Sequence, residues 1–179
     1  MSLIGISVGA NAQIKCYSPG TRTRTGLDQL PCVNLPIRRD CCKMKYFLAK
    51  TDPETYSIKQ LARDRRTVWD GVRNPQALRA IREMRPGDRV FVYHSMSDAA
   101  VVGLAEVLSG PRPDPKDPKL TVVDFGFRTL LEPATTLREI KASGKFPDWS
   151  LVRQSRLSTM AAPRAFVEWM RKRYPGQDV

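Results

Sequence analysis

The sequence predicts an α+β fold in which short strands form an antiparallel sheet or small barrel, with a few helices around it. Three observations lead to this prediction. Strand-like runs follow one another between residues 89 and 128 with turn residues between them, helical patterns stand on either side, and no internal repeat is present. The chain has 179 residues, which is enough for one domain with a substantial core.

The first 43 residues differ in composition from the rest of the chain. They are rich in Gly, Pro, Ser, Thr and Asn, and they hold all four cysteines: Cys16, Cys32, Cys41 and Cys42. The cysteine spacing does not match zinc ligands, and a disulfide framework, possible from the even number, would have no strands to link. We therefore expect residues 1–43 to be a disordered extension, or sequence upstream of a true start at Met44, and residues 44–179 to be the folded domain.

The first half of the domain is expected to contain one strand and two helices. Residues 45–49 form an apolar run typical of a strand. Ser57 followed by Gln60 is a capping box, which predicts a short helix over 57–63. A second helix begins at Asn74-Pro75, because asparagine can cap the free N–H groups and proline is tolerated at the first helical position. Its apolar stripe consists of Ala77, Ala80, Ile81 and Met84, and Pro86-Gly87-Asp88 ends it.

The second half is expected to be mainly strands, closed by helices. The predicted strands span residues 89–95, 99–108 and 120–128. A proline-spaced loop over 110–118 separates the last two of them. A capping box at Thr136 and Glu139 predicts another helix, and an apolar face over 164–173 predicts the final one. Residues 151–158 are expected to be a loop or short turn.

The stretch between Thr67 and Ala77 carries the strongest functional signal. A pocket for a flat polar ligand needs a ring for stacking, polar groups for the ligand's edges, and a glycine that lets backbone come close. Two structural alternatives stay open: the tryptophan could anchor the core, and the aspartate could pair with the arginine. The residues that combine these groups are Trp69, Asp70, Gly71, Arg73 and Asn74.

Two further segments are candidates for walls of such a pocket. Strand alternation puts His94 on one face and Tyr93 with Ser95 on the other, and the sequence does not decide which face would reach a pocket. His94 could equally be a hydrogen-bonded structural residue. Arg156 and Ser158 could form a polar wall that suits phosphates and base edges, or a solvated basic connection.

The composition of residues 44–179 argues against an enzyme. The segment has no cysteine and a single histidine, His94, so cysteine–histidine catalysis and the zinc site of base deaminases are excluded there. It also lacks a glycine-rich phosphate loop and a Gly-x-Ser-x-Gly turn. No cofactor or metal is expected. A hydrolase or nuclease that uses the Asp70 carboxylate and His94 stays open as the less favoured alternative.

The charge of the chain favours an anionic partner such as nucleic acid. The net charge is +12, and residues 1–43 hold only six of the 30 Lys and Arg and two of the 18 Asp and Glu, which leaves +8 for 44–179. Arg79, Arg82 and Arg153 are expected to contact phosphates. No apolar run is long enough to span a membrane, and residues 3–10 lack the basic start of a signal peptide. We expect a cytoplasmic monomer, associated with the nucleoid in a bacterium or nuclear in a eukaryote.

Five blocks of the domain, taken together, resemble the EVE domain of the PUA-like superfamily. They are Lys45–Lys50 with Tyr56–Ile58, Trp69–Asn74, Gly87–Ser95, Val102–Glu106 and Arg156–Ser158, in the family's order. The resemblance implies a PUA-like β-pseudobarrel with peripheral helices. It also implies a non-enzymatic module that holds a nucleic-acid base, often a modified one, in an aromatic-lined pocket. The loop over 110–119 is short for the family.

Carried over to matching positions, the resemblance implies a role for each block. Trp69 would be a stacking wall. The rim would consist of Asp70, Gly71, Val72, Arg73 and Asn74; Tyr93, His94 and Ser95 would lie beside the pocket; and Arg156, Leu157 and Ser158 would close it. The implied partner is DNA or RNA with a modified base. An RNA-binding or RNA-maturation accessory domain that uses the same pocket is the main alternative.

Overall fold

A computed structural model describes residues 44–96 and 99–179; the expected disorder of residues 1–43 lies outside the described residues. The strands are β1 (Tyr46–Thr51), β2 (Arg66–Trp69), β3 (Arg89–His94), β4 (Ala100–Val107), β5 (Arg112–Pro113), β6 (Thr121–Thr136) and β7 (Thr159–Ala161). The helices are α1 (Ile58–Asp64), α2 (Pro75–Glu83), α3 (Leu137–Ala142), α4 (Ser150–Arg153) and α5 (Arg164–Arg173).

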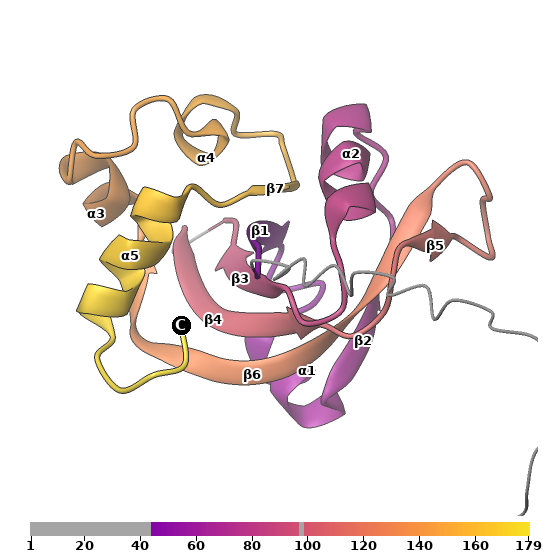
Figure 1. Cartoon of the computed structure of the whole chain (residues 1–179), viewed down its shortest axis with the longest axis horizontal. Coiled ribbons are helices and arrows are strands. Elements are labelled where there is room, and N and C mark those ends of the chain that lie inside the picture. The colour runs from indigo at the N-terminus through magenta and orange to yellow at the C-terminus, as the bar shows by residue number, and fades with distance from the viewer. Residues whose placement is uncertain (1–43, 97–98) are drawn as a thin grey trace, which may run out of the picture. The chain divides into compact units, whose positions relative to one another are not determined.

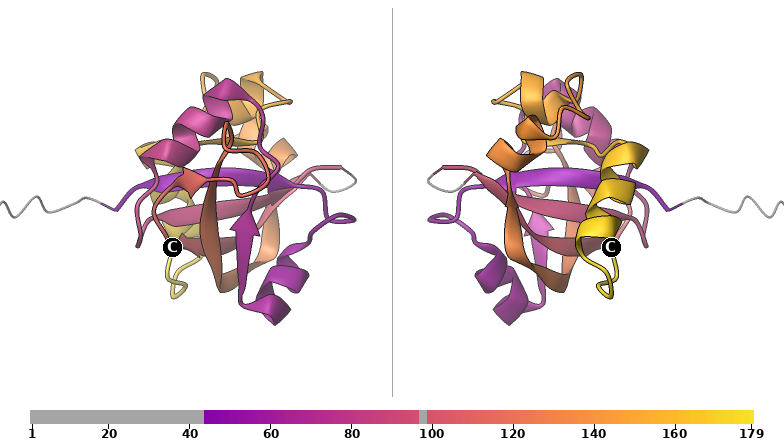
Figure 2. Two further views of the ribbon diagram at one scale, coloured as in Figure 1. Left: turned by 90° about the vertical axis from the view of Figure 1, so that its right-hand side faces the viewer. Right: turned by 90° about the vertical axis from the view of Figure 1, so that its left-hand side faces the viewer.

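The strands form one curled sheet in the order β2-β6-β4-β3-β1-β7, with β5 paired to β6 (Figure 1). The long strands β4 and β6 bend around the core, and helices pack outside, so the α+β pseudobarrel is confirmed. The two side views show α2 above the curled sheet and α1 below it (Figure 2). Helices therefore lie on opposite sides of the curled sheet (Figure 2).

The three strands predicted between residues 89 and 128 pair antiparallel, as expected, whereas β1 and β3 pair in parallel and make the sheet a mixed one. A parallel pair needs a crossover connection, and the segment that holds α1, β2 and α2 supplies it. This pairing sets Thr51 opposite His94 and Lys50 opposite Tyr93. The ends of β1 and β3 therefore lie side by side, which matters for the site described below.

Three short strands, β2, β5 and β7, and one short helix, α4, were not predicted. β2 has only four residues and pairs with β6. α4 overlaps the start of the segment expected to be a loop at 151–158, and β7 begins directly after it. β6 continues eight residues beyond the predicted end at 128, up to Thr136. Strands this short are stabilised by distant partners, so their own sequences carry little signal.

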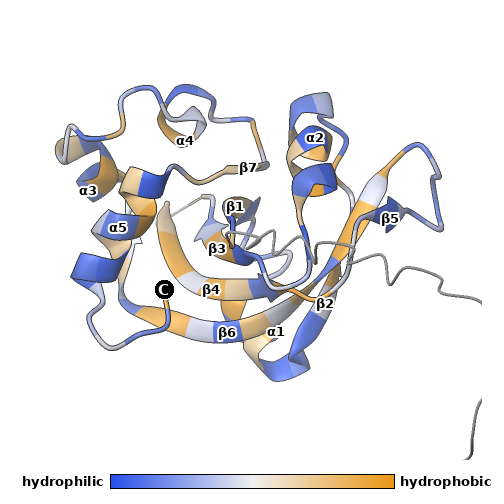
Figure 3. Ribbon diagram, viewed as in Figure 1, coloured by the Kyte–Doolittle hydropathy of each residue, from blue (hydrophilic) through white to orange (hydrophobic). Residues whose placement is uncertain are grey.

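The three predicted helix caps are confirmed. Ser57 with Gln60 and Thr136 with Glu139 form complete capping boxes, and Asn74 caps α2 through its side-chain oxygen. The hydrophilic residues of α2 and α5 lie on their outer sides, and their apolar residues face the sheet (Figure 3). The core beneath them is rich in aromatic rings; its largest fully buried side chains include Phe47, Phe91, Phe125 and Phe166.

One glycine fixes where α1 sits on the sheet. A Cβ at Gly103 of β4 would lie 2.7 Å from Cγ1 of Ile58, the first residue of α1, and 2.9 Å from the backbone oxygen of Thr129. Separations below 3.0 Å are too short for carbon atoms in contact. Gly103 therefore lets α1 approach the sheet more closely than any other residue would.

Candidate nucleic-acid interface

A cleft of about 460 Å³ lies beside Trp69. Its volume falls within the range of about 300–1,000 Å³ that is usual for small-ligand pockets. Three parts of the chain form it: the end of β1 with the residues that follow, β2 with the residues that follow, and one serine near the C-terminus. The lining residues are Lys50, Thr51, Asp52, Thr55, Tyr56, Thr67, Val68, Trp69, Asp70, Gly71, Val72 and Ser158.

Trp69 is both part of the packing and part of the cleft wall. Its ring centroid lies 5.1 Å from that of the fully buried Phe125, at an interplanar angle of 32°, so the core holds the indole in place. The indole Nε1 is buried and has no hydrogen-bond partner among the described residues. An unpaired buried donor costs about 1–3 kcal/mol. A ligand acceptor that reached this N–H would remove that cost.

Gly71 and Val72 continue the wall beyond Trp69. Gly71 has φ +73°, which residues with side chains rarely adopt, and a Cβ there would have no atom within 4 Å. The glycine is therefore needed for the backbone turn, and it leaves open space on the cleft side rather than allowing a close backbone contact. Val72 is buried and belongs to the core.

Asp70 pairs across the rim with Lys116, at 3.1 Å between Oδ2 and Nζ. The alternative in which Asp70 pairs with Arg73 is not found, and Arg73 is exposed. The Asp70–Lys116 pair brings the proline-spaced loop to the cleft. Both groups are well exposed, so the pair contributes at most about 1 kcal/mol. Asn74 does not line the cleft, because its Oδ1 accepts from the N–H groups of Gln76 and Ala77.

The Tyr93–Ser95 segment lies behind the cleft wall and not in the lining. Tyr93 is buried, and the Lys50 ammonium lies 5.7 Å from its ring centroid. Ser95 donates both its N–H (2.9 Å) and its hydroxyl (3.1 Å) to the Thr51 carbonyl. His94 Nε2 accepts from the Ile58 N–H at 3.0 Å. These residues hold wall residues and the start of α1 in position.

Lys50, at the end of β1, is hydrogen-bonded to the segment at 154–158 on the other side of the cleft. Its backbone N–H donates to the Ser158 carbonyl at 2.7 Å, and its ammonium donates to the carbonyls of Gln154 (3.3 Å) and Ser155 (3.1 Å). Burial lowers the pKa of Lys50 from its ordinary value. Ser158 lines the cleft, whereas Leu157 is buried and Arg156 is exposed outside the lining, and the closing role of these residues stays a prediction.

The wall over Lys50–Tyr56 is the part of the site that the sequence analysis did not identify. A signal was present, because the blocks Lys45–Lys50 and Tyr56–Ile58 contribute to the resemblance described above. The residues were not recognised because their approach to Trp69 depends on the pairing of β1 with β3 and β7, which no local pattern reveals.

The family model described as "EVE domain" matches residues 45–173. The chain belongs to the EVE domain family. Thymocyte nuclear protein 1 of Mus musculus is 33% identical over 124 residues, which are 54% of this chain and 55% of that protein. This EVE chain thus spans about half the length of that curated relative.

Solved structures are also similar to this EVE domain. A protein of Rhodopseudomonas palustris is 33% identical, with a TM-score of 0.69, and the match covers 72% of this chain and 92% of that one. The human THYN1 protein, solved in complex with 5-methylcytosine-containing DNA, is 24% identical with a TM-score of 0.65; the match covers 73% of this chain and 99% of that one. The second likeness shows the shared fold.

The arginines predicted to contact phosphates differ in their surroundings within this EVE domain. Arg79 is exposed on α2 beside a hollow of about 220 Å³. Arg82 donates from Nε to the Thr121 hydroxyl at 3.2 Å, and Arg153 pairs with Asp148 at 3.3 Å. Their role in phosphate binding stays a prediction.

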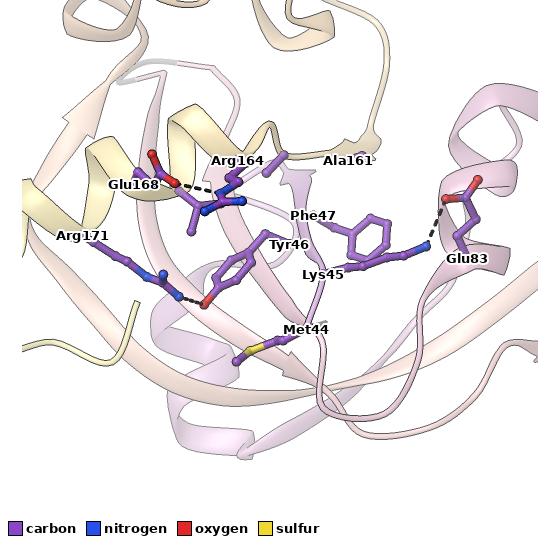
Figure 4. A pocket seen from close by; sticks show the side chains of 11 residues that line it. Met44, Lys45, Tyr46, Phe47, Glu83, Ala161, Arg164, Glu168 and Arg171 are labelled. Carbon is purple, nitrogen blue, oxygen red and sulfur yellow. Dashed lines mark hydrogen bonds and ion pairs between the residues drawn. The ribbon is translucent and has the colours of Figure 1, made fainter. Parts of the chain in front are cut away.

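A second cavity, of about 680 Å³, lies at the opposite end of β1 from the cleft (Figure 4). Each of its charged side chains already has a partner in the cavity lining. The contacts are Lys45 with Glu83 (3.7 Å), Arg164 with Glu168 (2.8 Å) and Arg171 with the Tyr46 hydroxyl (2.9 Å). The cavity contains none of the residues predicted to bind a base, so the Trp69 cleft is the better candidate.

No group of three or more His, Cys, Asp or Glu residues within 44–96 and 99–179 is placed to hold a metal ion. The alternative of a hydrolase built on Asp70 and His94 finds little support in the geometry. His94 does not line the cleft that Asp70 lines, and its Nε2 is occupied by the Ile58 N–H. None of the described helices has both the length and the apolar character needed to cross a lipid bilayer.

His94 should make the stability of the EVE domain depend on pH. Burial lowers the pKa of His94 below its ordinary value of 6.5, and the Asp52 carboxylate partly opposes this shift. Neutral His94 is therefore favoured by folding. Its contribution is complete above the unfolded pKa and is lost as the pH falls through the folded pKa.

We expect the free energy of unfolding to decrease as the pH falls from about 7 to 5, a decrease measurable by urea titration. His94→Gln keeps an acceptor for the Ile58 N–H but cannot titrate, so its stability should change less over this range. Equal pH dependence in the two proteins would contradict the role assigned to His94. The chain has no other histidine to confuse the result.

Proposed function

We propose that this EVE domain is a non-enzymatic nucleic-acid-binding module that holds one base, preferably a modified one, in the cleft beside Trp69. The observation that carries the proposal is the open cleft along an indole that the core ring of Phe125 holds in place. A planar base stacked on such a ring gains about 1–3 kcal/mol. The net charge of the chain supports attraction to a phosphate backbone.

The polar groups of the cleft favour a base that carries an amino group. Asp52 and Asp70 both line the cleft, and carboxylates accept hydrogen bonds from the amino group of cytosine. Oδ1 of Asp52 accepts from the Glu54 N–H at 3.0 Å, which orients the carboxylate. Human THYN1 has been solved with DNA that contains 5-methylcytosine, and this makes modified cytosine in DNA the first ligand to try.

Discrimination between modifications is expected to be modest. One methyl group in an apolar pocket changes binding by about 1–3 kcal/mol. Extrusion of the base from a duplex costs a few kcal/mol and is least for a base that is already unpaired. Single-stranded probes should therefore bind at least as tightly as duplexes, unless other parts of the protein compensate for the extrusion.

The test is fluorescence anisotropy of the full chain with oligonucleotides that differ only at one central base. The set contains cytosine, 5-methylcytosine, adenine and thymine in DNA, and the matching RNA strands. We expect 5-methylcytosine DNA to bind most tightly. A preference for RNA whatever the central base would favour the RNA-maturation alternative, and the absence of binding to every probe would refute the proposal.

Asp52→Asn should reduce the preference for amino-bearing bases. Asparagine keeps the oxygen that accepts from the Glu54 N–H, but it replaces the second oxygen by a donor that cannot accept from an amino group. We expect affinity for the cytosine probes to fall about tenfold and affinity for thymine to change little, as measured in the same anisotropy assay. An equal loss for both probes would show that Asp52 does not read the base edge.

A further inference from the structure

Met96 is the most exposed large hydrophobic side chain among the described residues. Its exposed fraction is 70%, compared with 47% for Met44, 47% for Val68 and 45% for Leu108. Its backbone has φ +83°, a region that residues with a long side chain rarely adopt. The chain therefore presents a large apolar group to solvent in an unfavourable backbone conformation, next to the end of β3.

Met96 directly follows a residue that is hydrogen-bonded to the cleft wall. The preceding residue, Ser95, donates two hydrogen bonds to the carbonyl of Thr51, and Thr51 lines the cleft. One residue further back, His94 pairs with Thr51 across the parallel strands. Met96 thus follows directly after a segment that is fastened to the back of the cleft wall. A second exposed apolar residue, Val68, lies in the cleft itself.

This placement suits a specific task in duplex binding. When a base leaves the double helix, it leaves a gap in the stack, and proteins that distort DNA insert apolar side chains such as Met, Leu, Ile or Phe between base steps. Methionine is unbranched and polarisable, so it can fill an irregular gap and contact the faces of bases. A wedge must stand close to the pocket that receives the base, and Met96 directly follows Ser95, which donates two hydrogen bonds to Thr51 of the cleft lining.

We propose that Met96 is a wedge that enters the base stack of duplex DNA while the neighbouring base occupies the Trp69 cleft. The inference rests on the function proposed above. The wedge would compensate for the cost of extruding the base. It would therefore allow the protein to bind a base that starts out paired in double-stranded DNA. A wedge should contribute to the affinity for duplexes but not to the affinity for single strands. A simple surface contact would contribute to both.

The test compares Met96→Ala with the wild-type full chain on three fluorescein-labelled probes. They are a duplex with a central 5-methylcytosine, the same duplex with a mismatch at that base, and the single strand. We expect Met96→Ala to weaken binding to the matched duplex by about tenfold, binding to the mismatched duplex by less, and binding to the single strand not at all. Met96→Leu should restore duplex binding, because it again supplies an apolar wedge.

Met44→Ala is the matched control, because it removes an exposed methionine side chain that lies before β1 and lines the other cavity rather than the cleft. It should leave binding to all three probes unchanged. Equal losses on duplex and single strand, or no loss on either, for Met96→Ala would overturn the wedge and leave the base-binding proposal standing. Failure of the wild type to bind any of the probes would instead remove the basis of both.

Discussion

Replacing Trp69 by alanine is expected to abolish selective binding of a modified-base oligonucleotide. Stacking on one aromatic side chain is worth about 1–3 kcal/mol per base, so affinity should fall by about 10- to 100-fold, toward that of non-specific binding. The remaining attraction would come from the basic surface and would weaken smoothly with added salt. Anisotropy at two salt concentrations separates the two contributions.

A control is needed because Trp69 also packs against Phe125. Truncation of a packed tryptophan lowers stability by up to about 3–5 kcal/mol, and less for a half-exposed one. Trp69→Phe keeps a ring against Phe125 and in the cleft but removes the indole N–H, so it should bind with intermediate affinity and lose little stability. If Trp69→Ala stays folded by circular dichroism and binds as tightly as the wild type, the cleft is not the base-binding site.

Gly103→Ala is expected to have the largest effect on stability among single-methyl additions. The new Cβ would meet Ile58 Cγ1 at 2.7 Å and the backbone oxygen of Thr129 at 2.9 Å, and neither can move freely because Ile58 is buried and Thr129 is in β6. Overpacking of this kind costs about 1–3 kcal/mol. The urea midpoint should fall accordingly. Affinity for the modified-base oligonucleotide should fall as well, because displacement of Ile58 breaks the hydrogen bond from its N–H to Nε2 of His94.

Gly126→Ala serves as the matched control. The three atoms nearest to its Cβ would all belong to the side chain of Leu108, the first at 3.0 Å, and Leu108 is 45% exposed. Gly126 is buried as well, but a partly exposed side chain can give way where the backbone oxygen of Thr129 cannot, so we expect a smaller loss of stability than for Gly103→Ala. Equal urea midpoints for the two variants would show that α1 can shift away from the sheet without loss, which would contradict the close fit at Gly103.

Local signals in the sequence predicted the local structure well. The capping oxygens of Ser57, Asn74 and Thr136 bond backbone N–H groups within three residues, so a short sequence window contains both partners. The parallel pairing of β1 with β3 and the short strands β2 and β7 depend on partners far along the chain. A short window contains only one of the two partners, so these features were missed.

For the candidate site too, residues close together in the sequence were predicted, and residues that only the fold brings together were missed. Trp69, Asp70, Gly71 and Val72 are contiguous in sequence and line the cleft together with Ser158. Of the other residues predicted for the pocket, those of the Tyr93–Ser95 segment support the wall from behind, and Asn74 caps a helix. The wall after β1 was missed because only the folded sheet brings it to face β2.

The three hydrogen bonds of Lys50 to the segment at 154–158 have a consequence for how the protein is made. The ammonium of Lys50 reaches carbonyls that lie 104 and 105 residues further along the chain. On a ribosome, the tryptophan side of the cleft is synthesised long before the segment that closes it. The cleft therefore forms only late in synthesis, and a nascent chain that stops short of residue 154 would carry the indole without the closing wall.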